Sequence, residues 1–224
     1  MRLSAAAGDP VAGGYASNIR GIVAIYHNRH TEAGAYLGRA IEEFRADGNR
    51  PSEASALSNL SRVLLQNGEH AEAVALAERA LAIYNEVGLT WRLANGMYAL
   101  GLALAASGRH DEAVDQLSGA LPVFQENRQP LWEGMTLFRM AEIALDTGEA
   151  AKAATLAEQA LVQLRGIGGD WRRGNVLTVL GKALFALGQQ GRARACWTEA
   201  LGVYERLSRP EAADVRELLA HAPQ

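Results

Sequence analysis

Apolar residues recur along the chain at the spacing of a helix face, and the pattern itself returns every 40 residues. Leu57, Leu60 and Leu64 illustrate the spacing, because residues three and four positions apart lie on the same side of an α-helix. No segment alternates apolar and polar residues with the period of two that a half-buried strand requires. One copy of the pattern therefore predicts two amphipathic helices, at about 52–67 and 69–87, and the whole chain predicts an all-α fold.

Alanine occupies two positions of the repeat in every copy, seven residues apart. Alanines in fixed phase indicate a packing constraint, because a small side chain lets two antiparallel helices approach closely. A larger side chain at such a joint would overpack it, at a cost of about 1–3 kcal/mol. The two series are Ala33, Ala73, Ala113, Ala153 and Ala193, and Ala40, Ala80, Ala120, Ala160 and Ala200.

Glycine recurs at two other positions of the repeat, where the helices are expected to end. Glycine adopts the positive φ that follows many helix C-termini, because it has no Cβ atom to clash with the backbone. Three copies replace glycine with another residue, at Asn28, Arg128 and Ser208. The glycines of the two predicted turns are Gly68, Gly108, Gly148 and Gly188, and Gly48, Gly88 and Gly168.

The five copies predict a single domain over residues 1–224, followed at its end by one more helix. We place the repeats at approximately 11–49, 51–89, 91–129, 131–169 and 171–209. The last helix, 210–221, begins at Pro210 and carries apolar residues on one side, so it is expected to cap the fifth repeat. Trp197 replaces smaller residues of earlier copies and is expected to pack against this cap.

The first copy departs from the pattern, because Arg20 stands where later copies have leucine or methionine, and "AGGY" is a poor helix-forming sequence. We expect its first helix to be frayed or to lack a preceding neighbour. An open start and a capped end suggest the C-terminal part of a longer protein.

The repeat resembles the tetratricopeptide repeat. The resemblance rests on the pairs Leu60-Ser61, Leu100-Gly101, Met140-Ala141 and Leu180-Gly181, each followed by alanine twelve residues later and again seven further on. It implies an α-solenoid of about five helix pairs in a right-handed superhelix with a C-terminal capping helix. The period exceeds the usual length of about 34 residues and is similar to that of a longer-helix variant in large bacterial regulators. HEAT repeats of roughly 40–47 residues fit less well, because the phasing of glycine and alanine matches tetratricopeptides.

The composition is that of an ordinary globular protein and argues against several functions. The chain has 224 residues, 49% of them hydrophobic and 21% charged, and a net charge of −3 without the basic excess of a nucleic-acid-binding surface. Cys196 is the only cysteine, so neither a disulfide framework nor a thiol metal cluster is possible within the chain. The N-terminus lacks a signal-peptide core, and the longest uncharged run, 93–108, is too short to span a membrane. We therefore expect a cytoplasmic protein without membrane contact.

Two motifs could suggest chemistry, and both fit the repeat better. His30, His70 and His110 share one repeat position, so they lie on alternate helices whose axes pack about 8–10 Å apart. They cannot converge on one metal ion, because ligation requires about 2 Å from each nitrogen. The glycine-rich run at 165–175 has no preceding strand, which a phosphate-binding loop needs. We expect no catalytic residue, metal or cofactor, and no enzyme activity.

The resemblance implies that function lies in the concave groove that the first helices of the pairs would line. Groove positions vary between copies while packing positions do not, which indicates that the groove is used. Tyr98 and Phe138 are the expected aromatic anchors, and Arg62, Arg139 and Lys182 could bind an acidic side chain or a carboxylate. The predicted groove residues are Asn59, Arg62, Asn95, Tyr98, Leu102, Met135, Phe138, Arg139, Glu142, Asn175, Thr178, Lys182 and Phe185.

Three functions stay open at this point. The first is a protein-interaction module, and the resemblance is most specific to the C-terminal regulatory domain of bacterial SARP-type and signalling-ATPase regulators. The partner would then be a peptide, a protein, or another domain of the same longer chain, with no direct nucleic-acid contact. The alternatives are a free-standing adaptor and a domain that binds a small ligand or peptide signal. A homodimer through apolar residues of the first copy, Ile19, Ile22, Val23 and Ile25, also stays open.

Overall fold

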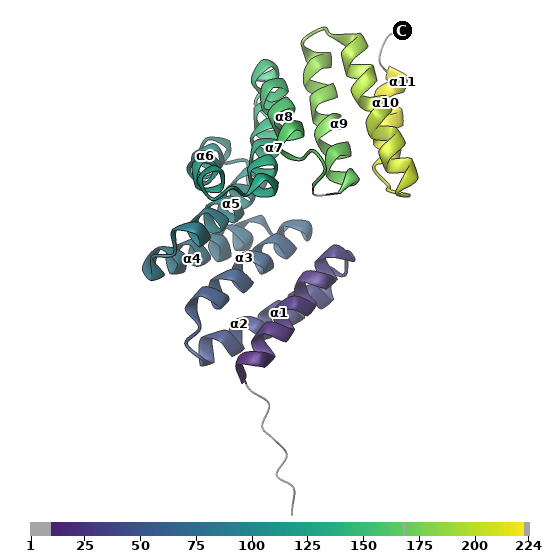
Figure 1. Cartoon of the computed structure of the whole chain (residues 1–224). Helices are drawn as coiled ribbons and strands as arrows, with labels where there is room; N and C mark the ends of the chain where they lie inside the picture. The colour runs from purple at the N-terminus through teal and green to yellow at the C-terminus, as the bar shows by residue number, and fades with distance from the viewer. Residues whose placement is uncertain (1–9, 168, 222–224) are drawn as a thin grey trace, which may run out of the picture. The chain divides into compact units, whose positions relative to one another are not determined.

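The computed structural model describes residues 10–167 and 169–221, and these residues form eleven α-helices and no strand. Figure 1 shows the helices following one another as hairpins joined by short turns. Contacts divide the chain into two compact units, residues 1–120 and 121–224. The helices are α1 (Pro10–Tyr26), α2 (His30–Ala46), α3 (Arg50–Gln66), α4 (His70–Val87), α5 (Thr90–Ala106), α6 (His110–Glu126), α7 (Pro130–Asp146), α8 (Ala150–Gln163), α9 (Asp170–Ala186), α10 (Gln190–Arg206) and α11 (Ala212–His221).

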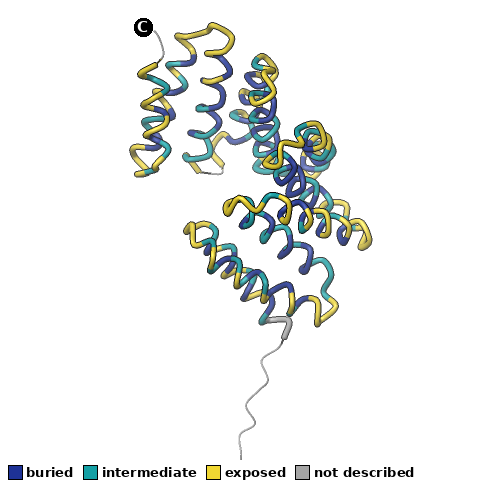
Figure 2. The backbone as a smooth tube through the Cα atoms, turned by 180° about the vertical axis from the view of Figure 1, so that it is seen from behind, coloured by how far each residue is buried: buried dark blue, intermediate teal, exposed yellow. Residues whose placement is uncertain are grey.

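Within each unit, helices that follow one another in the chain pack together, and the first helices of neighbouring pairs also touch. In the first unit α1 packs on α2 and α3 on α4, while α3 also contacts α5. In the second unit α7 packs on α8 and α9 on α10, α7 contacts α9, and α11 lies on α10. Figure 2 shows exposed residues gathered at the turns and buried ones recurring along each helix. The predicted all-α solenoid of helix pairs is confirmed; the single domain and its repeat bounds stay predictions.

The turn residues expected from the sequence adopt the left-handed backbone conformation. Gly148 has φ 81°, and the three residues that replace glycine, Asn28, Arg128 and Ser208, have φ 56°, 51° and 50°. Gly168 lies outside the described residues. A residue with a Cβ atom is strained there, by roughly 1–2 kcal/mol, so the fold tolerates Arg128 and Ser208 at a cost.

The first helix is continuous from Pro10 to Tyr26, without the fraying that the sequence suggested as one of two alternatives. Its glycines are the reason that α2 can pack on it. A Cβ atom at Gly14 would lie 2.7 Å from the Phe44 ring, and one at Gly21 would lie 2.6 Å from Leu37 Cγ. Phe44 and Leu37 are themselves fully buried. The loss of helix propensity at glycine is therefore offset by close packing of two large side chains.

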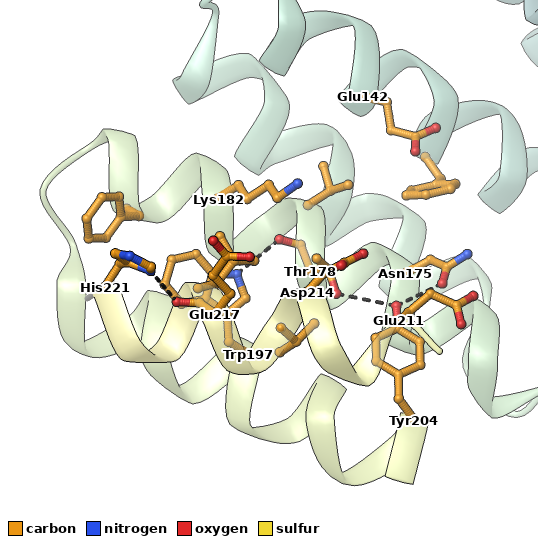
Figure 3. A pocket seen from close by; sticks show the side chains of 15 residues that line it. Glu142, Asn175, Thr178, Lys182, Trp197, Tyr204, Glu211, Asp214, Glu217 and His221 are labelled. Carbon is orange, nitrogen blue, oxygen red and sulfur yellow. Dashed lines mark hydrogen bonds between the residues drawn. The ribbon is translucent and has the colours of Figure 1, made fainter. Parts of the chain in front are cut away.

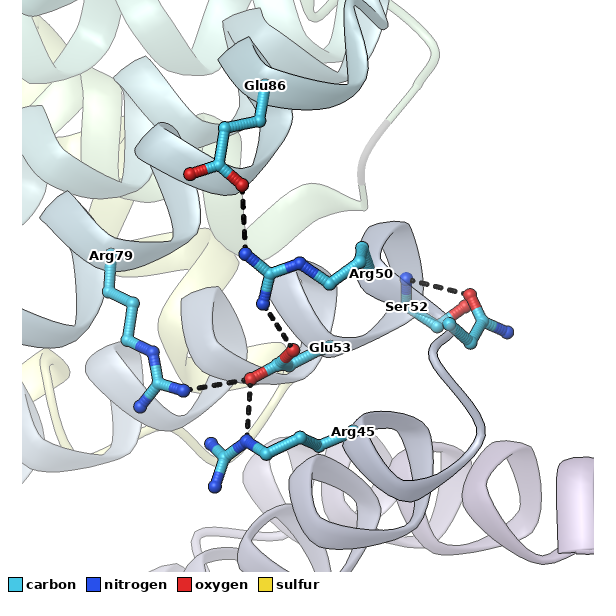
Figure 4. A network of polar contacts seen from close by, with 7 residues as sticks. Arg45, Arg50, Ser52, Glu53, Arg79 and Glu86 are labelled. Carbon is cyan, nitrogen blue, oxygen red and sulfur yellow. Dashed lines mark hydrogen bonds and ion pairs between the residues drawn. The ribbon is translucent and has the colours of Figure 1, made fainter.

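A fully buried carboxylate joins three helices of the first unit (Figure 4). Glu53 on α3 accepts hydrogen bonds from Arg45 Nε of α2 at 3.0 Å and from Arg79 of α4 at 2.9 Å. Arg50 donates to its other oxygen at 2.9 Å and reaches Glu86 of α4 at 2.9 Å. A buried charge is tolerated only when it is paired in this way, so Glu53 connects α2 and α4 to α3 through ion pairs.

The second unit uses the same repeat positions with other residues. Gln125 donates to Glu133 at 3.2 Å, and these two residues occupy the repeat positions of Arg45 and Glu53. Arg173 donates to Glu199 at 2.6 Å, at the positions of Glu53 and Arg79 with the charges exchanged. These contacts are solvent-exposed, so each contributes at most about 1 kcal/mol.

We expect Glu53→Gln to lower the free energy of unfolding by about 2–4 kcal/mol, because the neutral side chain leaves buried ion pairs broken. The matched change Glu133→Gln should cost less than about 0.5 kcal/mol, since that side chain is partly exposed. Urea denaturation followed by circular dichroism measures both. Equal losses would show that the buried network adds nothing beyond a surface contact.

Replacing Arg128 with glycine should stabilise the protein by about 0.5–1 kcal/mol, because relief of strain outweighs the added freedom of the unfolded chain. Gly148→Ala should destabilise it by about 1–2 kcal/mol for the converse reason. Gly38→Ala is the control, because that glycine lies inside α2 with open space around it and should gain about 0.5–1 kcal/mol. Thermal unfolding gives all three values, and a loss at position 128 would contradict the argument.

Candidate functional site

The second unit contains a pocket of about 760 Å³ between four helices. Figure 3 shows the side chains of α9 facing those of α11 across it. Its apolar floor includes Val179, Trp197 and Val215, which are 8%, 2% and 1% exposed. The remaining lining residues are Phe138 and Glu142 of α7, Asn175, Thr178, Lys182 and Phe185 of α9, Tyr204 of α10, and Glu211, Asp214, Glu217, Leu218 and His221 at α11.

The structure brings six of the predicted groove residues together in this pocket: Phe138, Glu142, Asn175, Thr178, Lys182 and Phe185. Met135 and Arg139 belong to the same unit but do not line it. The other five lie on α3 and α5 of the first unit: Asn59, Arg62, Asn95, Tyr98 and Leu102. That these five form part of a partner-binding groove stays a prediction.

The two aromatic residues expected to act as anchors are buried. Tyr98 and Phe138 are only 6% and 2% exposed, so they are not projecting anchors. Phe138 belongs to the hydrophobic core of the second unit and contributes an edge of the pocket. The repeat position alone could not reveal this, because the same position carries small polar residues in other copies.

Sequence reasoning missed the contribution of α11 to the pocket. The expectation that this helix covers the fifth repeat is confirmed, because it packs on α10 and buries Val215. Its pocket-facing residues include Asp214, Glu217 and His221. They stand three and four positions apart, which places them on one helical face. The sequence did contain this spacing. It indicates a pocket wall only when the position of α9 on the opposite side is known.

Hydrogen bonds hold the floor of the pocket in place. Trp197 Nε1 donates to the Thr178 carbonyl at 3.2 Å, and the Tyr204 hydroxyl donates to Asn175 Oδ1 at 2.8 Å. The Thr178 hydroxyl donates to the Gly174 carbonyl at 2.9 Å. Burial raises the pKa of Tyr204 above its usual value, so its hydroxyl stays protonated and can donate. The floor is therefore formed before any ligand arrives.

The charged residues around the pocket fall into two groups. Glu142 pairs with Arg139 at 2.6 Å, and Glu211 pairs with Arg209 at 2.6 Å. Burial raises the pKa of Glu211, but hydrogen bonds from Arg209 and the backbone and the nearby Arg209 charge outweigh it, so the pKa lies below its usual value. Both carboxylates are thus paired with a neighbouring arginine. Lys182, Asp214 and Glu217 form no ion pair with another residue that the structure describes.

Trp197 can form the floor because the residue opposite it is glycine. A Cβ atom at Gly181 of α9 would overlap the Trp197 indole ring. The same two repeat positions hold Gly101 and Leu117 in the first unit, where a Cβ would lie 2.8 Å from Leu117 Cγ. Where the partner is small, as in the pair Ala141 and Ala157, the glycine is absent. Residue size is thus compensated across each helix pair.

The three histidines considered as metal ligands do not line this pocket. His30, His70 and His110 begin α2, α4 and α6. Within the described ranges no group of three or more His, Cys, Asp or Glu residues could hold a metal ion. Cys196 is partly buried, and burial raises the pKa of its thiol. None of the helices in the described part of the chain is long and apolar enough to cross a membrane.

Comparison with known proteins identifies the repeat. Family profiles described as tetratricopeptide repeat match residues 16–86 and residues 94–118 and 134–159. Together these matches cover more than half of the chain, which therefore belongs to the tetratricopeptide repeat family.

The chain is also similar to particular bacterial regulators. It is 55% identical over 219 residues to the regulatory protein AfsR of Streptomyces griseus, which covers 98% of this chain and 21% of that protein. It is 52% identical over 222 residues to AfsR of Streptomyces coelicolor, covering 99% of this chain and 22% of that protein. The chain thus spans about a fifth of the length of these relatives. The resemblance to large bacterial regulators is confirmed.

Solved structures share the fold at low sequence identity. The Rap conjugation gene regulator of plasmid pLS20, solved with the Phr* peptide, has a TM-score of 0.78 and 15% identity, covering 98% of this chain and 61% of that one. A STAND protein with a tetratricopeptide repeat sensor from Pyrococcus horikoshii has a TM-score of 0.74 and 16% identity, covering 90% and 31%. These similarities establish the fold alone.

A double-mutant cycle tests the size compensation under the pocket. Gly181→Ala should cost about 1–3 kcal/mol through overlap with the indole, and Trp197→Ala about 3–5 kcal/mol through the cavity it leaves. The double variant should cost at least about 1 kcal/mol less than the sum, because two alanines already occupy these positions in the preceding copy. Urea denaturation measures the cycle. Additive losses would mean that the two side chains do not limit each other.

Proposed function

We propose that this chain is the regulatory domain of a larger bacterial transcriptional regulator, and that it binds a peptide or helix of a protein partner. The observation that carries the proposal is the pocket of the second unit, which gathers six of the residues predicted for partner binding. The repeat fold and the regulatory relatives point to a non-catalytic domain. Its place of action would be the cytoplasm, where bacterial transcription occurs.

The relatives support this proposal at two levels. The chain spans about a fifth of two regulatory proteins, so a part in regulation is the simplest role for it. The Rap regulator with the same fold was solved with a peptide, and the STAND protein uses its repeats as a sensor. The partner would be a separate protein or another domain of the same longer chain.

The pocket has the properties of a binding site that exists before its ligand arrives. Its volume lies within the range of about 300–1,000 Å³ that is typical of ligand pockets. Its floor is apolar and already held by hydrogen bonds, so little conformational freedom would be lost on binding. Lys182 and Phe185 on its rim are exposed, and Phe185 leaves 39% of its surface accessible. A partner inserted here would touch α9 and α11 together.

Site-specific photo-crosslinking tests the proposal in cells that contain the partner. The crosslinker p-benzoylphenylalanine is introduced at Phe185, on the pocket rim, or at Leu187, which is 40% exposed but lies outside the pocket. We expect a defined crosslinked partner from position 185 and a much weaker one from position 187. Adding Lys182→Glu should reduce the crosslink at 185, because it changes the pocket charge without changing the fold.

Two results would count against partner binding in this pocket. One is equal crosslinking from both positions, which would mean that the contact is non-specific. The other is the absence of any crosslink from position 185 when the variant is folded and abundant. Circular dichroism before irradiation shows that the variants are equally helical.

A further inference from the structure

Opposite charges face each other across the pocket of the second unit. Figure 3 shows Lys182 on α9 on one side, and Asp214 and Glu217 on α11 on the other. All three side chains are exposed. Within the described residues, none of the three forms an ion pair, in contrast to Glu142 and Glu211 of the same pocket. The space between the walls therefore separates charges that would otherwise neutralise one another.

The two carboxylates are arranged to receive one cation. Asp214 and Glu217 stand three residues apart on α11, so they project from the same side of the helix. A guanidinium group can donate to two carboxylates at once through its fixed fork of N–H groups, and an ammonium group can do so as a point charge. Glu211, three residues before Asp214, already forms an ion pair with Arg209 at 2.6 Å. The free acceptors are thus confined to one part of the wall.

The floor between the walls selects for an apolar group. Val179, Trp197 and Val215 form it, and the partly buried Leu218 also lines the pocket. The polar atom of the floor that could have received a ligand, Trp197 Nε1, already donates to the Thr178 carbonyl at 3.2 Å. A ligand that covers this floor gains by removing apolar surface from water, while its charges reach the walls.

We infer that the pocket binds a peptide in which a basic side chain stands next to an apolar one, and in which a carboxylate lies within reach of Lys182. The inference rests on the proposed function, because it specifies the ligand of the same pocket. The basic side chain lies against Asp214 and Glu217, the apolar side chain covers the floor, and the carboxylate pairs with Lys182. The carboxylate is either the C-terminus of the peptide or an acidic side chain.

This assignment differs from the sequence-based expectation that the groove captures an acidic partner. That expectation rested on Arg62, Arg139 and Lys182. Arg139 pairs with Glu142 at 2.6 Å and Arg62 lies in the other unit, so of these three residues Lys182 is the one that lines this pocket. The two carboxylates of α11, Asp214 and Glu217, were not among the predicted groove residues, and they outnumber the single lysine, Lys182.

Affinity selection with the full chain tests the inference. A pool of synthetic random heptapeptides, free at both ends, is incubated with the wild-type chain, and the retained peptides are sequenced by mass spectrometry. The same selection uses Asp214→Lys/Glu217→Lys and the neutral pair Asp214→Asn/Glu217→Gln. The control is Asp115→Lys/Asp146→Lys, which changes the net charge equally at two exposed positions outside the pocket.

The wild type and the control should retain peptides enriched in arginine or lysine close to a large apolar residue. The charge-reversed variant should lose this enrichment and retain acidic peptides instead. For a selected peptide, fluorescence anisotropy should show about tenfold weaker binding to the reversed variant, because two attractive contacts become repulsive. Lys182→Glu should weaken binding several-fold, and amidation of the C-terminus should do the same only if the terminal carboxylate is the partner of Lys182.

The outcomes separate this inference from the proposed function. If the wild type retains peptides that Phe185→Ala loses, but neither enrichment nor affinity responds to changes at positions 214 and 217, the charge assignment is overturned and peptide binding stands. If the wild type retains no peptides beyond those of Phe185→Ala, both are overturned. The neutral pair keeps the test decisive if the charge-reversed chain does not fold.

Discussion

The close approach of paired helices is the constraint on which this structure depends. Alanine or glycine at the joints brings two helices together, and each large side chain is matched by a small one across the joint. Phe44 over Gly14 in the first unit and Tyr204 over Gly174 in the second are the same solution at the same repeat positions. Because interiors are close-packed, a change on one side requires a change on the other.

The pocket is a consequence of this rule at the end of the repeat array. Gly181 makes room for Trp197, the largest side chain at its repeat position, and the indole then forms a floor that no earlier copy has. The capping helix α11 adds a wall that carries Asp214 and Glu217, which form no ion pair within the described part of the chain. The cap that buries the last repeat therefore also supplies side chains to the candidate site.

Polar contacts between repeats are more variable than the apolar joints. Glu53 is fully buried among three arginines in the first unit, whereas the second unit places Glu133 and Arg173 at equivalent positions in exposed pairs. Buried charges are costly unless fully paired, so only one copy carries such a centre in the described residues. Variation at these positions is compatible with a fixed backbone, because the apolar joints already determine it.

The sequence by itself determined the helix pairs, their 40-residue phase, the capping helix and the turns, including the left-handed residues Asn28, Arg128 and Ser208. These features follow from local rules, because helical periodicity and positive φ depend on few neighbouring residues. Only the tertiary structure decided that Phe138 is buried and that Asp214 and Glu217 face Lys182. Such a site joins residues far apart in the chain, and which charges face one another depends on how the helices pack.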